Sequence, residues 1–146
     1  MWREAYLETR ILSADPMELV CLLYQHAIDA VRDARRHLAT GDIAARAQAM
    51  SKALAILGEL NSSLNHGAGG ALSRNLEQLY GYMMTRLTEG NLQKDDKALA
   101  EVEKLLSSLA EAWTAVHALQ SKTAQPPAPA WQDAGGESPA AHMWSA

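Results

Sequence analysis

Hydrophobic residues between positions 15 and 121 recur every three or four residues, which is the spacing of one face of an α-helix. The first stretch starts at Asp15-Pro16, because Asp can accept hydrogen bonds from free backbone N–H groups and Pro suits the first helical position. We expect Gly41 to end this helix and Asp42 to cap the next. The hydrophobic positions of this first stretch are Val20, Leu23, Ala27, Val31, Ala34 and Leu38.

Three further stretches have the same spacing. The second extends from Ile43 to near Asn65, where the Gly-rich run 67–70 is expected to form a tight turn. The third ends at about Gly90 and is followed by a polar turn over 91–96. The fourth starts at Asp95 or Asp96, and its hydrophobic residues are Leu99, Val102, Leu106, Leu109, Trp113 and Val116.

Four helices of about 20 residues with short connections predict an all-α fold, an antiparallel four-helix up-down bundle over residues 15–121. Residues 1–14 form an N-terminal arm that is too hydrophobic for a free tail, so we expect it to lie on the bundle. Residues 122–146 are rich in Pro and Gly and are predicted to be disordered. Trp131 and Trp144 in this tail could anchor a partner.

Composition narrows the range of functions. The formal net charge is −4 at pH 7, which argues against a nucleic-acid surface and against docking on anionic lipid. The sequence contains no run of about 20 apolar residues, so it predicts no membrane-spanning helix. Cys21 is the one cysteine, and charges lie where a secretory signal would be apolar, so we expect a cytoplasmic protein.

Candidate catalytic and metal-binding groups are few. His26, Asp29, Asp33 and His37 share one helical face, but this face lies opposite the hydrophobic stripe and is interpreted as solvated surface. We therefore expect no metal, no cofactor and no enzyme activity. One alternative stays open: His37, four residues before Gly41, could make the bundle a phosphotransfer or signalling module.

The hydrophobic surface exceeds what one stripe per helix requires. Residues 19–24 are apolar around the whole helix, and the second helix has a second row beside its first. The arm and ordinary broad packing could cover these faces, or a second copy could bury them in a homodimer. A third interpretation is a groove for the amphipathic helix or extended segment of a partner.

An ordered set of landmarks resembles the flagellin export chaperone family, FliS. The set begins with Tyr6, the helix start Asp15-Pro16-Met17-Glu18-Leu19 and the Leu23-Tyr24 pair. The most specific element is Asn75-Leu76 with Leu79-Tyr80 and Tyr82-Met83, before Arg86-Leu87. The set ends with Glu101-Val102, Leu105-Leu106 and Trp113, so that the resemblance covers residues 6 to about 116.

The resemblance implies a cytoplasmic chaperone that holds the disordered C-terminal segment of flagellin in hydrophobic grooves. It implies that the chaperone blocks premature polymerisation and assists delivery to the flagellar type III export gate. Other flagellar regulators, such as an anti-sigma factor, are further partners to consider, and a homodimer in the absence of cargo stays open.

The second rows and the resemblance together give the candidate site residues. We expect the groove to include Ile56, Leu60, Asn75, Tyr82 and Met83.

The resemblance also implies that the N-terminal arm covers part of this surface until cargo arrives. Tyr6 and Leu7 are the expected plug.

Overall fold

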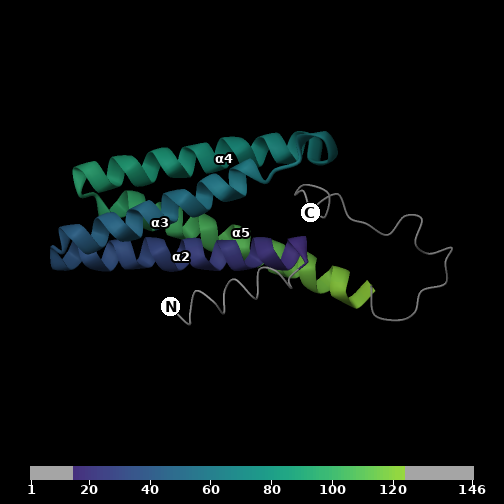
Figure 1. Cartoon of the computed structure of the whole chain (residues 1–146), viewed down its shortest axis with the longest axis horizontal. Coiled ribbons are helices and arrows are strands. Elements are labelled where there is room, and N and C mark those ends of the chain that lie inside the picture. Colours follow the sequence, from purple (N-terminus) through teal and green to yellow (C-terminus); the bar gives the residue numbers. More distant parts are fainter. Residues whose placement is uncertain (1–14, 124–146) are drawn as a thin grey trace.

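The computed structural model describes residues 15–123, which form four α-helices. They are α2 (Pro16–Thr40), α3 (Ile43–Ser62), α4 (His66–Gln93) and α5 (Asp96–Thr123). Successive helices are antiparallel, and both α2 and α4 pack against α3 and α5 (Figure 1). The predicted all-α four-helix bundle is therefore confirmed. Residues 122 and 123, which were predicted as tail, belong to α5. The arm with Tyr6 and Leu7 and residues 124–146 of the predicted tail lie outside the described residues, so their predicted roles stay predictions.

The predicted start of the bundle is confirmed at atomic detail. The Asp15 carboxylate accepts a hydrogen bond from the Glu18 backbone N–H at 2.7 Å, with Pro16 in the first turn. Gly41 ends α2 in the left-handed conformation, with φ of 77°, which glycine adopts without a steric penalty. Asp42 then caps α3 and accepts from the Ala45 N–H at 3.1 Å. Local sequence signals therefore determine the connection between α2 and α3.

The connection between α3 and α4 differs from the prediction. α3 ends at Ser62, and Asn65 caps α4 by accepting from the Ala68 N–H at 3.3 Å. The expected Gly-rich turn is instead the first turn of α4, and the helix is interrupted at Gly70, which has φ of 56° and ψ of −130°. Glycine alone adopts this conformation readily, so the run serves as a break inside the helix.

The predicted end of the third helix at about Gly90 is also wrong. α4 continues to Gln93, and Lys94 takes the left-handed capping position and donates its N–H to the Gly90 carbonyl. Gly90 is buried against α5: a Cβ atom there would lie 2.5 Å from Leu99 Cδ1 and 2.9 Å from Ala98 Cβ. The missing side chain therefore lets α4 approach α5 closely, which outweighs the weak helix propensity of glycine.

The core joins residues of all four helices. Tyr24 of α2 and Tyr80 of α4 meet in the centre, where their hydroxyls are hydrogen-bonded at 2.5 Å. Burial raises the pKa of Tyr24 to about 12, against the smaller opposing effect of its hydrogen bonds with Tyr80 and Trp113. The large side chains that are completely enclosed around this pair include Leu57, Leu60, Met83, Leu87, Leu99 and Leu106.

The two ends of the bundle are built differently. One end, which we call the turn end, carries the α2–α3 and α4–α5 connections (Figure 1). There the Arg35 guanidinium of α2 donates to Asp96 at 2.8 and 2.9 Å and to Glu103 at 2.9 Å, which ties α2 to α5. The other end, the open end, carries the α3–α4 connection, the start of α2 and the last turns of α5.

Candidate binding surface

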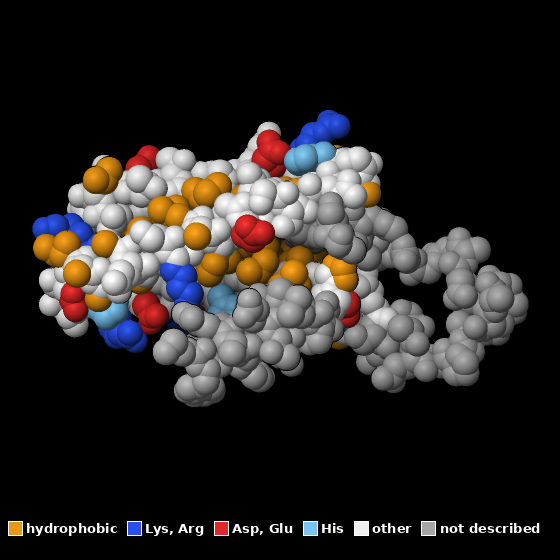
Figure 2. All heavy atoms as spheres, in the orientation of Figure 1, with side chains coloured by type: hydrophobic (Ala, Val, Ile, Leu, Met, Phe, Trp, Pro, Cys, Tyr) orange, Lys and Arg blue, Asp and Glu red, His pale blue; other side chains and the backbone are white. Residues whose placement is uncertain are grey.

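Half-buried hydrophobic side chains flank the core rows, and most of them lie in the half of the bundle toward the open end. In Figure 2, hydrophobic side chains are visible along the seam between α2 and α3 and along the seam between α3 and α4. The half-buried residues toward the open end are Cys21, Leu23, Leu54, Ile56, Leu79, Leu109, Ala110 and Val116. Part of the surplus predicted from the sequence is therefore accessible on the described bundle, while another part, such as Leu60, is enclosed in the core.

A row of partly exposed hydrophobic residues follows the seam between α4 and α5. Its register is set by Glu101 of α5, which accepts from the Tyr82 hydroxyl at 2.6 Å and from Arg86 Nε at 2.8 Å. Because the two helices are antiparallel, residues before Tyr82 lie beside residues after Glu101, in steps of three and four. We define the α4–α5 strip as Leu72, Leu79, Tyr82, Leu105, Leu109 and Val116, all half-buried or exposed.

A second, smaller strip lies between α2 and α3. Leu54 and Ile56 occupy opposite flanks of the buried row of α3, because two residues correspond to a rotation of about 200°. Ile56 lies on the flank that carries Ala49 and Ala53, and α2 buries Ala27, Ala30 and Ala34. These small side chains let α2 and α3 approach closely. Leu19, Leu23 and Ile56 stay half-buried toward the open end, and we call them the α2–α3 strip.

The structure separates the five predicted groove residues into two groups. Leu60 and Met83 have no exposed surface and pack inside the core. Ile56 is half-buried, Asn75 is exposed and Tyr82 is 44% exposed.

The accessible residues of the prediction do not form one continuous surface. Asn75 and Tyr82 are seven residues apart on one face of α4, beside the α4–α5 strip. Ile56 belongs to the α2–α3 strip, so the predicted residues contribute to two separate seams.

Three residues of the α4–α5 strip were not recognised as surface residues in the sequence. Leu105, Leu109 and Val116 are half-buried on α5. Leu109 and Val116 are predicted in the core-facing stripe, and both do pack against the core while part of each stays exposed. The doublet Leu105-Leu106 was the available signal, because adjacent residues lie about 100° apart and only one of them can point to the core.

Charged groups border the strip at Tyr82. The hydrogen bond from the Tyr82 hydroxyl, followed by that from Arg86, lowers the pKa of Glu101. The same hydrogen bond raises the pKa of Tyr82. The Tyr82 ring is thus fixed by its hydroxyl end while 44% of the residue stays exposed, which provides a preorganised aromatic contact.

The remaining candidates for chemistry are accounted for by the fold. Burial raises the pKa of the Cys21 thiol, which makes it a poor nucleophile. Within residues 15–123, no group of three or more His, Cys, Asp or Glu side chains could hold a metal ion. His37 lies in the last turn of α2, where its carbonyl accepts the Gly41 and Asp42 N–H groups. Among the described helices, none has both the length and the apolar content required to span a membrane.

Fold and surface together define the class of protein, a four-helix bundle with partly exposed apolar strips between its helices. The chain belongs to the FliS family of flagellar secretion chaperones. The model of the family described as "Flagellar protein FliS" matches residues 2–120.

Curated relatives agree with this assignment. The chain is 40% identical over 113 residues to the flagellar secretion chaperone FliS of Salmonella typhimurium, covering 77% of this chain and 84% of that protein. It is 31% identical to FliSB of Pseudomonas aeruginosa over 115 residues, covering 79% of this chain and 91% of that protein. It is 32% identical to FliS of Bacillus subtilis over 118 residues, covering 81% of this chain and 86% of that protein. This is a family of non-enzymatic chaperones, which favours the chaperone interpretation over phosphotransfer at His37.

Proposed function

We propose that this chaperone binds the disordered C-terminal segment of flagellin on its apolar strips, and that it thereby prevents premature polymerisation and assists export. The observation that carries the proposal is the α4–α5 strip, in which partly exposed leucines and the fixed Tyr82 ring form a row along two helices. Family membership supports a secretion cargo, and flagellin is the cargo that the resemblance implies.

The chemistry of such a strip fits a disordered partner. A cargo segment that cannot bury its own hydrophobic residues gains about 25 cal/mol for each Å² of apolar surface that it buries on the bundle. This gain must exceed the entropy cost of ordering the segment. A strip with leucines at helical spacing accepts the apolar face of an amphipathic helix, which is the common helix-in-groove mode of recognition.

The predicted groove residues take different roles in this proposal. Tyr82 contacts cargo directly, and Asn75 provides a polar contact at the edge of the α4–α5 strip. Ile56 contacts a second part of the cargo on the α2–α3 strip, so one segment would have to wrap around the bundle. Leu60 and Met83 support the strips from beneath. The arm with Tyr6 and Leu7 covers part of this surface before cargo binds.

The same proposal includes the wider setting of the protein. The chaperone acts in the cytoplasm and presents its cargo to the flagellar export gate. Other flagellar regulators are further proposed partners. A homodimer formed without cargo is a further proposed state, which size-exclusion chromatography with light scattering would detect.

Isothermal titration of the full chain with the flagellin C-terminal segment tests the proposal. Replacing both Leu72 and Leu79 by Ala should weaken binding about tenfold or more, because truncated anchors in an interface centre each cost above about 1 kcal/mol. The matched control replaces both Ile43 and Leu92 by Ala. These residues are 64% and 77% exposed at the turn end, and their replacement should leave the affinity for the flagellin segment unchanged. Equal affinities for both double variants would contradict the proposal. Circular dichroism melting curves would verify that both variants fold.

A further inference from the structure

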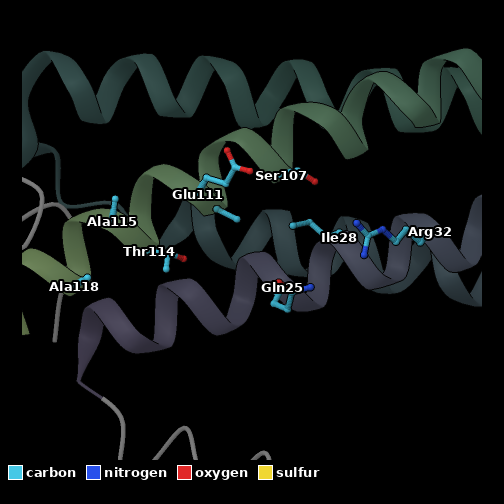
Figure 3. A pocket seen from close by; sticks show the side chains of 9 residues that line it. Gln25, Ile28, Arg32, Ser107, Glu111, Thr114, Ala115 and Ala118 are labelled. Atoms are coloured by element: carbon cyan, nitrogen blue, oxygen red, sulfur yellow. The ribbon is translucent and has the colours of Figure 1, made fainter.

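A separate groove lies between α2 and α5, away from both strips. Its volume is about 550 Å³, and it opens along one side (Figure 3). Its walls are formed by Gln25, Ile28 and Arg32 of α2 and by Ser107, Ala110, Glu111, Thr114, Ala115 and Ala118 of α5. The groove exists because the α5 side chains that face it are mostly small, so that the two helices leave space between them.

The lining of the groove favours one large, flat side chain with a hydrogen-bond donor. Ala110, Ala115 and Ala118 provide apolar walls, and Ile28 is almost completely buried at its base. The Glu111 carboxylate and the Gln25 amide oxygen are acceptors at its edge. Tryptophan combines a large apolar ring with an N–H donor, and burying one removes roughly 150–250 Å² from water.

The chain itself supplies such a residue at a suitable distance. The C-terminal segment, residues 124–146, follows directly after α5, whose residues between Ser107 and Ala118 form one wall of the groove. The segment contains Trp131 and Trp144. The distance along the helix axis from Thr123 back to Ala115 is about 12 Å, at about 1.5 Å per residue. The seven residues 124–130 can span about 22 Å in a Pro-rich extended form, which is enough to reach this position.

We propose that the C-terminal segment folds back on the bundle and places Trp131 in the α2–α5 groove. Pro126, Pro127 and Pro129 stiffen the spacer, so less conformational entropy is lost when the segment docks. The docked tail shields an apolar face of α2 and α5 from other partners. This inference is independent of flagellin binding, because the groove shares no residue with either strip.

Disulfide trapping in the full chain tests the docking. In a Cys21→Ser background, Gln132→Cys next to Trp131 is paired with Ala115→Cys in the groove wall. Adding Trp131→Ala should slow formation of the intramolecular disulfide about tenfold, because the docked tail has a high effective concentration at the groove. Trp131→Phe should retain most of the rate.

Two controls make the result decisive. Gln132→Cys paired with Gln78→Cys, which is exposed on α4, should form a disulfide slowly and without dependence on Trp131. Trp144→Ala should leave the Gln132–Ala115 rate unchanged. If Trp131→Ala leaves that rate unchanged, or if Trp144→Ala lowers it more than Trp131→Ala does, the proposed docking of Trp131 is wrong.

Discussion

The turn end and the open end of the bundle are stabilised in different ways. At the turn end, Gly90 brings α4 into close contact with α5, and Arg35 joins α2 to two carboxylates of α5. Toward the open end, α4 is interrupted at Gly70, and most of the half-buried hydrophobic residues lie in this half. One end is thus fixed by a close helix contact and by ion pairs, while the other leaves more apolar surface accessible.

A clamp at the open end shows how the interruption is tolerated. The His66 ring contacts Ser73 Oγ through Nδ1 at 2.8 Å and the Glu77 carboxylate through Nε2 at 2.8 Å. These contacts connect the first turn of α4 to the rest of the helix across Gly70. Ser73 is completely buried, so its hydroxyl needs the partner that His66 supplies. These side-chain contacts therefore add to the buried core of the open end, which includes Val20, Leu60 and Leu76.

The largest expected effect is at the turn end, at Gly90. Gly90→Ala should destabilise the fold by about 1–3 kcal/mol, because the new methyl group would overlap Leu99 and Ala98 in a packed interface. Gly81→Ala in the same helix is the matched control, since a Cβ there meets nothing within 4 Å. It should stabilise by about 0.5–1 kcal/mol through better helix propensity. Urea denaturation would measure both, and similar effects of the two changes would contradict close packing at Gly90.

A smaller effect is expected at the open end, at Gly70. Gly70→Ala should destabilise by about 1–2 kcal/mol, because alanine adopts φ of 56° with ψ of −130° only under strain, and this cost exceeds its gain in the unfolded chain. No neighbouring atom would contact the new methyl group, so the effect is purely conformational. Gly67→Ala, which has only one ordinary contact with Asn65, should be neutral or stabilising. If Gly70→Ala lowers the stability of the fold more than Gly90→Ala does, the proposed difference between the two ends is wrong.

The smallest effect concerns the ion pairs of the turn end. Arg35→Ala should destabilise by about 0.5–1 kcal/mol at neutral pH, the upper range for exposed pairs, because Arg35 bridges two carboxylates. Arg36→Ala is the control: Arg36 pairs only with Asp33 on its own helix and should have almost no effect.

The pH dependence follows from the carboxylates. The hydrogen bond from Arg35 lowers the pKa of Asp96. Burial works to raise the pKa of Glu103, but the hydrogen bonds from Arg35 and Arg32 outweigh it and leave this pKa lowered. A lowered pKa in the folded state stabilises the fold above the ordinary values of 3.8 for Asp96 and 4.5 for Glu103. This contribution is lost as pH falls below them, so the difference between wild type and Arg35→Ala should shrink in acid. A difference that stays constant down to about pH 2 would contradict the coupling.

The sequence predicted those parts of the fold that depend on local signals. Asp15 and Asp42 were predicted as caps and Gly41 as a helix end, because their side chains or backbone freedom act within one turn. Gly90 was misread as a helix end, since its role depends on Leu99 and Ala98 across the interface with α5. Local propensity does not contain that contact.

The candidate site was predictable only as a surplus. Hydrophobic rows reveal how much apolar surface a helix has, but not which residues are covered by neighbours. Leu60 and Met83 are enclosed in the core while Ile56 and Tyr82 stay accessible, although the hydrophobic pattern of the helices predicts all four as groove residues. Helix rotation and the register set by Tyr82 and Glu101 decide this difference, and both are properties of the assembled bundle.

Methyl NMR of the isotopically labelled full chain, titrated with the flagellin C-terminal segment, tests the division between the two ends most directly. The account predicts the largest shifts at the methyl groups of the strips, at Leu72, Leu79, Leu109 and Val116, with a second set at Leu23 and Ile56. It predicts no significant shifts at Ile43 and Leu92, although these are more exposed. Largest shifts at Ile43 and Leu92, with the strip methyl groups unchanged, would contradict it.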